Sequence, residues 1–378
     1  MSKGSITMRG KDSWRLKYDL PPHPVTGERQ TRYATFKGTK RRAQDEIARL
    51  ITLANGGVDL APASLTVETY IDKWLEDTVK PSVRARTFEG YQNIVRRHLI
   101  PGLGRMPLRA LTPMHIQSYY SDKAKSGLAN QTIVHHHRLL FQALKHAHNA
   151  RQIEFNPAGA VRPPKVEREE IVVLTRNELL ILLSTLTGRR MHTMVLLAAC
   201  TGMRRSEVLG LRWSDVDLET GHLTVNQQLE QTKEHGLRFE PPKTRSSRRR
   251  ITLPQTVIDA LRRWRVKQNE EHLRLGVGHD DKRLVFTRRD GEAYSPKAIT
   301  RRFDKIIRKI DITRITFHGL RHTHLTHLLR DNVNVKVVSA RAGHSSVAIT
   351  LDVYGHLIEG MEATAADAVE DWFASRER

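Results

Sequence analysis

The chain has 378 residues, and its 63 Lys and Arg against 41 Asp and Glu give a formal net charge of +22. With 39% hydrophobic residues it can bury a substantial core, and its length predicts two or three domains. It has one cysteine, Cys200, no apolar run near the length of a membrane span and no apolar leader, so we expect an intracellular, soluble protein without disulfides or a Cys-rich zinc module.

The positive charge is spread along the whole chain. Residues 1–64, 65–170 and 171–378 carry net charges of +6, +6 and +10, so no segment is an isolated basic arm. A polyanion that contacts the whole molecule explains this spread, and duplex DNA is the first candidate. The alternative is a generally basic, soluble enzyme.

The first 55 residues predict a small sheet followed by a helix. Residues 14–18 and 29–36 alternate in polarity as strands do, and the turn-rich PPHPVTGE lies between them. Residues 40–55 repeat apolar side chains on one helical face, and Gly56-Gly57 ends that helix. The following stretch up to Ser64 is typical of a linker.

From Leu65 to about Ala160 the pattern predicts only helices. The four expected helices begin near Thr66, Thr87, Ile116 and Ile133. Asn156-Pro157 is expected to end the last one, and a second linker follows at 162–165. Four short helices with basic faces are typical of a module that grips DNA, although a helical bundle of another purpose has the same pattern.

The remainder is mixed. Helices are expected at Arg176–Leu186, Met191–Cys200, Thr256–Leu273, Pro296–Arg308 and almost continuously after His318. Strands and turns are expected at 215–254, with a hairpin around Thr220-Gly221. The final segment, 360–373, is amphipathic, and it is a candidate for docking on a neighbouring protomer or on its own domain.

Phosphoryl transfer on DNA uses either carboxylates that hold Mg²⁺ or fixed cations around the phosphate with a side-chain nucleophile. The chain has no convincingly spaced acid cluster, since Asp215 and Asp217 are typical of hairpin turn residues. Walker A and glycine-rich nucleotide fingerprints are also absent. The second route fits better, and we expect neither a metal nor another cofactor.

The segment TGMRRSEVLGLRW, residues 201–213, places Arg204 at the start of a helix. A guanidinium there can bind phosphate oxygens in bidentate fashion, close to helix-terminal N–H groups. Glu207 follows three residues later on the same side and can hold the Arg204 side chain. Alone, this pattern fits an ordinary ion pair at a solvated helix start equally well.

The segment FHGLRHTHLTHLLR, residues 317–330, contains His318 and Arg321 one helical turn apart. This spacing is weak by itself because His-x-x-Arg occurs five times in the chain, but here an apolar lead and Gly319 precede a helix. His318 and His322 also have the spacing of metal ligands. No carboxylate or cysteine completes a ligand set and HExxH is missing, so an anion site is favoured over zinc.

The segment AGHSSVAITLDVYGHL, residues 342–357, places His344 after a small-residue turn and Tyr354 ten residues later. A phenol has a pKa of about 10, so as a nucleophile it needs cationic neighbours, which the Arg and His motifs can supply. The alternative is a half-buried tyrosine with a bonded hydroxyl, which is the commoner environment of a single tyrosine.

The segment PPKTRSSRRRITLP, residues 241–254, is a basic turn that leads into a short strand. Its arginines are expected to grip phosphates. Lys243 stands apart because it follows two prolines near the strand edge, and an ammonium beside a scissile phosphate can protonate a leaving alkoxide.

Jointly and in this order, these four segments resemble the tyrosine recombinase (phage integrase) family. The catalytic resemblance covers about 171–360, the helical stretch looks like the family's core-binding domain, and residues 9–55 are more weakly similar to the arm-binding domain of integrases. The resemblance implies a multidomain α+β chain. Its parts would be a small three-stranded sheet plus helix with a linker (1–64), an all-α, SAM-like core-binding domain (65–165) and a mixed, mainly α catalytic domain with a small β-sheet (166–378).

Carried over residue by residue, the resemblance makes Tyr354 the nucleophile, which forms a 3′-phosphotyrosyl link and releases a 5′-hydroxyl. Arg204 and Arg321 would clamp the non-bridging oxygens, and Lys243 would protonate the leaving oxygen. One phosphodiester replaces another, so neither ATP nor a metal is implied.

The remaining carried-over roles support this chemistry. His318 would accept or position the tyrosine proton, His344 would donate a hydrogen bond to the phosphate, and Glu207 would hold Arg204 in place.

The resemblance also implies partners. A homotetramer would act on two DNA duplexes in the cytoplasm, at core-type and arm-type sites, to integrate and excise a prophage or other mobile element. An excisionase and a DNA-bending host factor are candidate accessory proteins, and no membrane partner is implied. The alternatives are a chromosome-resolving recombinase, a catalytically idle DNA-binding regulator on the same scaffold, and a nicking–closing topoisomerase.

Overall fold

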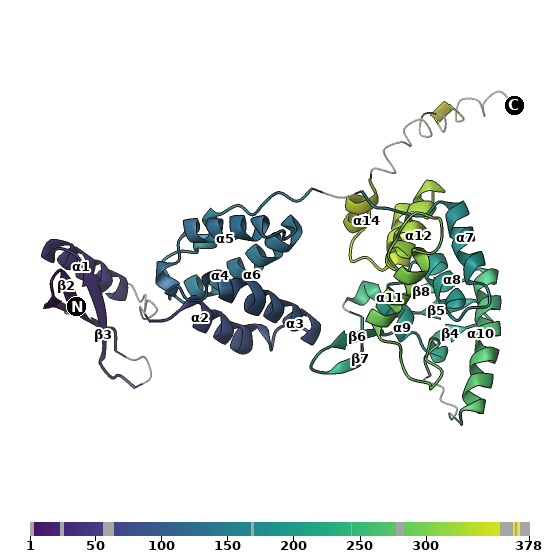
Figure 1. Ribbon diagram of the computed structural model, residues 1–378, viewed down its shortest axis with the longest axis horizontal. Helices are drawn as coiled ribbons and strands as arrows, with labels where there is room; N and C mark the ends of the chain where they lie inside the picture. The colour runs from purple at the N-terminus through teal and green to yellow at the C-terminus, as the bar shows by residue number, and fades with distance from the viewer. Residues whose placement is uncertain are drawn as a thin grey trace. The chain divides into compact units, whose positions relative to one another are not determined.

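The structure is a computed structural model that describes residues 4–22, 26–55, 64–167, 170–242, 244–276, 283–355, 366 and 369–370. The chain divides into two compact units, Met1–Arg168 and Glu169–Arg378, and Figure 1 labels their helices and strands. In the described ranges, no helix is long and apolar enough to cross a membrane. Lys243 and most of the amphipathic segment 360–373 lie outside the described residues.

The first unit begins with an antiparallel three-stranded sheet and a helix. The sequence pattern predicted the helix and two of the strands, and the third strand was implied by the resemblance alone. Its elements are β1 (Gly4–Gly10), β2 (Ser13–Leu20), β3 (Gln30–Lys37) and α1 (Lys40–Asn55), with the strands in the order β1-β2-β3. Alternate residues of β2, including Leu16 and Tyr18, point to one face of the sheet and are buried with Ile47 and Leu50 of α1.

Helices form the rest of the first unit around a separate hydrophobic cluster. They are α2 (Val67–Trp74), α3 (Ala85–Ile94), α4 (Ile100–Leu103), α5 (Pro113–Lys125) and α6 (Asn130–Asn149), with π-helical turns at Leu75–Val79 and Val95–Leu99 and 3₁₀ turns at Leu108–Ala110 and Pro157–Ala160. Several predicted boundaries were wrong. The second, third and fourth helices begin at Ala85, Pro113 and Asn130, two or three residues before the predicted starts. Helix α6 also ends at Asn149, and Asn156 instead caps the 3₁₀ turn by accepting from the Ala158 N–H.

The second unit is mainly helical with two small antiparallel sheets. Its helices are α7 (Arg176–Leu186), α8 (Met191–Thr201), α9 (Arg205–Gly210), α10 (Gln255–Arg274), α11 (Pro296–Ile307), α12 (Gly319–Arg330), α13 (Val335–Ala342) and α14 (Val347–Tyr354), with 3₁₀ turns at Trp213–Asp215 and Arg245–Ser247. One sheet has the order β4-β5-β8 (Val216–Asp217, His222–Thr224 and Arg250–Thr252), and β6 (Gln228–Thr232) pairs with β7 (Gly236–Glu240). The hairpin around Thr220-Gly221 and the mixed α+β class are confirmed. The apolar helix α8 is buried along nearly its whole length, so the loop that follows it is held firmly.

Candidate active site

Five of the predicted site residues line one cleft of the second unit, which has a volume of about 470 Å³: Arg204, Glu207, His318, Arg321 and His344. Arg204 precedes α9, His318 and Arg321 belong to the start of α12, and His344 lies between α13 and α14. The fold therefore brings together all four motifs, since Thr244 and Ser247 of the fourth motif also line the cleft. Lys243, the fourth motif's lysine, lies outside the described residues.

Two glycines allow the backbone turns that precede these side chains. Gly202 ends α8 with φ +65°, and a Cβ there would come within 2.7 Å of a histidine ring of α12. Gly343 ends α13 with φ +67°, and a Cβ there would lie 2.8 Å from the Arg249 guanidinium. Left-handed backbone favours glycine, so each turn depends on it for both conformation and space.

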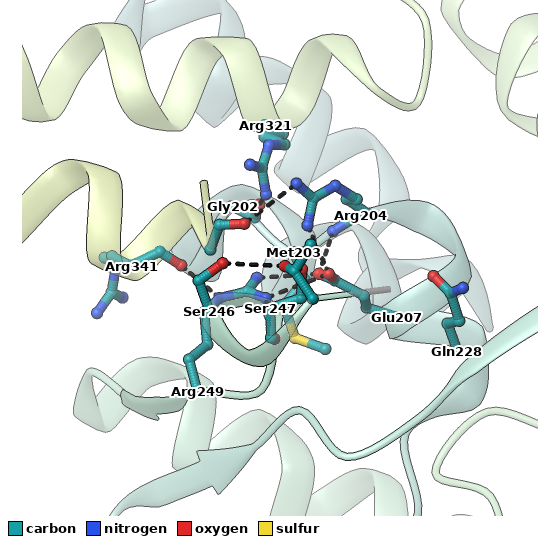
Figure 2. A network of polar contacts seen from close by, with 12 residues as sticks. Gly202, Met203, Arg204, Glu207, Gln228, Ser246, Ser247, Arg249, Arg321 and Arg341 are labelled. Atoms are coloured by element: carbon teal, nitrogen blue, oxygen red, sulfur yellow. Dashed lines mark hydrogen bonds and ion pairs between the residues drawn. The ribbon is translucent and has the colours of Figure 1, made fainter. Parts of the chain in front are cut away.

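Arg204 is held by the buried carboxylate of Glu207, as the sequence predicts. Its Nη1 donates to Glu207 Oε1 at 2.8 Å and its backbone N–H donates to Oε2 at 2.8 Å (Figure 2). Burial alone raises the pKa of Glu207, but the hydrogen bonds and charges of Arg249 and Arg204 outweigh it, so the pKa is lowered and the carboxylate stays ionised. The fork of Arg204 is thus fixed while a third of its side chain stays exposed.

The expectation that all arginines of 241–254 grip phosphates is wrong for Arg249. This residue is 8% exposed, and its Nη1 and Nη2 donate to the two oxygens of Glu207 at 3.2 and 2.9 Å (Figure 2). The physical reason is strand alternation, because Arg249, Ile251 and Leu253 all point inward from β8 and its flanks. Arg249 therefore holds the Glu207 carboxylate in position within the protein and is not available to bind phosphate.

Arg321 is buried and is only partly bonded. Its Nη1 donates to the Gly202 carbonyl at 2.7 Å, whereas Nη2 is buried without a hydrogen-bond partner among the described residues. Burial, followed by repulsion from Arg204, lowers the pKa of Arg321 to about 10. A buried guanidinium with a free N–H in a cleft is a strong anion site, because an anion supplies both the missing acceptor and a counter-charge.

Both cleft histidines are neutral at physiological pH. Desolvation, then repulsion from His322 and Arg321, lowers the pKa of His318 to about 4, although part of this residue remains exposed. Burial, then Arg321 and Arg204, lowers the pKa of His344 to about 4. The fixed positive charge of the described cleft therefore comes from arginine, and the imidazoles act as neutral donors or acceptors.

Tyr354 ends α14 and is not among the residues that line the cleft. The side chain is 2% exposed, and its hydroxyl lies 2.7 Å from Nδ1 of His322. We expected cations to lower its pKa. Instead burial raises the pKa of Tyr354 to about 12, and Arg321 opposes this only in part. The structure thus holds the phenol in its neutral form.

The sequence analysis did not identify two residues that make contacts at the site, His322 and Arg341. His322, rather than His318, touches the Tyr354 hydroxyl, and its position one turn after His318 was the available signal. Arg341 donates to the Cys200 and Thr252 carbonyls and so ties α13 to the end of α8 and to β8. No group of three or more potential metal ligands occurs in the described part of the chain.

Comparisons with known proteins agree with this layout. The sequence profile described as "Phage integrase family" matches residues 172–360, and that described as "Phage integrase, N-terminal SAM-like domain" matches residues 66–124. The chain is 27% identical over 353 residues to a XerC-like tyrosine recombinase of Caldanaerobacter subterraneus subsp. tengcongensis, which covers 89% of this chain and 90% of that protein. It is 23% identical over 350 residues to the ICEBs1 integrase of Bacillus subtilis, covering 92% and 94%.

Two solved structures have the same fold. The Tn1549 transposon integrase in complex with transposon right end DNA matches with a TM-score of 0.70 at 23% identity, covering 80% of this chain and all of that chain. A lambda integrase dimer bound to a COC′ core site matches with a TM-score of 0.55 at 19% identity, covering 90% and 91%.

Proposed function

The chain belongs to the phage integrase family of tyrosine recombinases, and from this premise we propose that it cuts and rejoins duplex DNA at specific sites to integrate and excise a mobile element. The observation that carries the proposal is the shared cleft. Two arginines and two neutral imidazoles meet there, and a buried Arg321 N–H still needs an acceptor. A phosphodiester supplies that acceptor together with the negative charge that the cleft favours.

In this proposal, Arg204 and Arg321 bind the two non-bridging oxygens of the scissile phosphate. Their positions are set before DNA arrives, because Glu207 holds one fork and the Gly202 carbonyl holds the other. Fixed donors stabilise the additional charge of the pentacoordinate transition state, and each is worth about 10²–10³ in rate. Lysine lacks the planar fork, so an Arg→Lys change is expected to impair cleavage.

The Tyr354 oxygen attacks the phosphorus, and the bond from phosphorus to the 5′ oxygen breaks. The phenolic proton passes to an imidazole, either His318 or His322, and Lys243 protonates the leaving oxygen. Because the hydroxyl starts from a buried position outside the cleft, it must move to the phosphate before attack. A 5′-hydroxyl of the partner strand then attacks the phosphotyrosyl link, which restores a phosphodiester and completes strand exchange.

The test is capture of a covalent adduct. The full-length protein is mixed with nicked duplexes drawn from the DNA that flanks its gene, where inverted repeats are sought first. A denaturant-resistant protein–DNA complex is expected. Tyr354→Phe should abolish it without weakening DNA binding, while Tyr294→Phe, the matched change at the other tyrosine of this unit, should leave it intact. An adduct that survives in Tyr354→Phe would rule out this nucleophile.

We further propose that the three domains have different roles in DNA binding. Residues 1–64 bind arm-type sites, residues 65–165 grip the core site together with the catalytic domain at 166–378, and four protomers assemble on two duplexes with accessory proteins. Deletion of residues 1–64 should remove binding to a second class of DNA site and spare core-site binding. Unchanged binding to both classes would contradict the arm function.

A further inference from the structure

Thr350 occupies an unusual position beside His344. It lies on α14, it is completely buried, and its hydroxyl oxygen is 2.8 Å from Nδ1 of His344. Its place in the sequence is one helical turn before Tyr354, so the two side chains share a face of the helix that carries the proposed nucleophile. A threonine hydroxyl here therefore connects a residue of the cleft to that helix.

The direction of this hydrogen bond follows from the needs of a buried hydroxyl. A buried O–H requires an acceptor, and His344 Nδ1 is the partner that the described structure gives Thr350. A neutral imidazole has one donor nitrogen and one acceptor nitrogen. If Nδ1 accepts from Thr350, the proton of His344 must be on Nε2.

We propose that Thr350 is a positioning residue for His344: its hydroxyl donates to Nδ1, which fixes the tautomer whose Nε2–H donates to the scissile phosphate. This inference rests on the proposed function. It also couples the orientation of the His344 donor to the position of the helix that carries Tyr354. The Nε2–H tautomer is favoured only while α14 packs against His344 and keeps the Thr350 hydroxyl in contact with Nδ1. Burial, reinforced by the charges of Arg321, Arg204 and Arg249, lowers the pKa of His344 to about 4, so the neutral ring has a single proton to place.

The first test uses activity. Thr350→Val keeps the shape and removes the hydroxyl, and it should slow adduct formation on nicked DNA about 10-fold with DNA binding unchanged. Thr350→Ser, which restores the hydroxyl, should recover most of the rate. Thr193→Val makes the same change at another buried threonine of this unit and should have no effect. In a His344→Ala background, Thr350→Val should cause no further loss, because there is no ring to orient.

The second test needs no DNA. In full-length protein labelled with ¹⁵N at histidine, the His344 resonances, identified by their loss in His344→Ala, should report a single Nε2–H tautomer. Thr350→Val should introduce the other tautomer and raise the pKa of His344 by about one pH unit, since a donor to Nδ1 favours the neutral ring.

The outcomes separate the two proposals. A wild-type protein that forms no adduct contradicts the proposed function. A wild-type adduct with Thr350→Val within twofold of the wild-type rate overturns the positioning role alone. The positioning role is likewise overturned if Thr350→Val slows the His344→Ala protein as much as the parent, or if the ¹⁵N spectrum is unchanged.

Discussion

Replacing Glu207 by glutamine should destabilise the second unit severely. The carboxylate is 3% exposed and accepts four hydrogen bonds, two on each oxygen, from Arg204 and Arg249. In glutamine one of the two oxygens becomes an NH₂ group, which is a donor. In either orientation of the amide, two N–H groups of Arg204 and Arg249 would then face this NH₂ group and lose their acceptor. The two guanidinium groups also lose the charge that neutralises them.

The magnitude follows from those lost contacts. Two charge-assisted hydrogen bonds are worth about 1.5–3 kcal/mol each, and removing one partner of a buried ion pair costs about 3–5 kcal/mol. We therefore expect Glu207→Gln to lower the free energy of unfolding by about 3–5 kcal/mol. For a unit of this size, each kcal/mol corresponds to about 2–4 °C, so the midpoint should fall by roughly 10 °C.

Calorimetry of the full chain measures this shift directly. Glu219→Gln is the matched control, because Glu219 is 89% exposed and its ion pair with Arg262 spans 3.5 Å. An exposed pair of this kind is worth about 0–1 kcal/mol, so the control should shift the midpoint by no more than about 4 °C. If Glu207→Gln behaves like the control, the buried carboxylate does not organise the two arginines.

Further predictions concern pH, the nucleophile and salt. Burial lowers the pKa of His136 from 6.5 to about 4, so the unfolded chain binds the extra proton, and His136 alone should contribute a loss of about 3 kcal/mol of stability as the pH drops from about 6.5 to about 4. In urea unfolding, His136→Leu should therefore reduce the pH dependence by that amount, and an unchanged dependence would contradict a neutral, buried His136. His322→Phe leaves the buried Tyr354 hydroxyl without its acceptor, and nitration of Tyr354 in the absence of DNA should rise about 10-fold; unchanged nitration would contradict a holding role for His322. DNA affinity should fall with salt at a log–log slope of about −5 to −10, and a slope near zero would refute phosphate-dominated binding.

The sequence predicted most of the helices and strands, because the spacing of apolar residues within a segment is enough to indicate its secondary structure. The helices Lys40–Asn55 and Arg176–Leu186 were predicted with the bounds that the structure has, since each has a clear apolar face. The end of α6 was not, because Asn156 is a capping residue and its side chain caps a 3₁₀ turn rather than ending the helix. A capping residue marks a boundary without showing which element it bounds.

The candidate site shows the same division between local and long-range information. The pairing of Arg204 with Glu207 depends on three-residue spacing and was predictable. The contact between His322 and Tyr354 joins α12 to α14, and only the packing of the second unit decides which imidazole faces the phenol. The raised pKa of Tyr354 was missed for a related reason, because cations in neighbouring motifs do not reveal how deeply the phenol is buried.

Not all of the net charge of +22 is available to bind DNA, because some of the cations are bonded inside the protein. The Arg249 guanidinium binds Glu207 and the Arg341 carbonyl, and the Arg341 guanidinium binds carbonyls of α8 and β8 and a histidine ring. Both guanidinium groups are bonded to acceptors within the protein, and both tie together the segments that carry Arg204 and His344. We therefore expect exposed cations to set the salt dependence of DNA binding, whereas cations bonded inside the protein set the geometry of the cleft. Neutralising Arg341 should accordingly affect cleavage much more than it affects the salt slope.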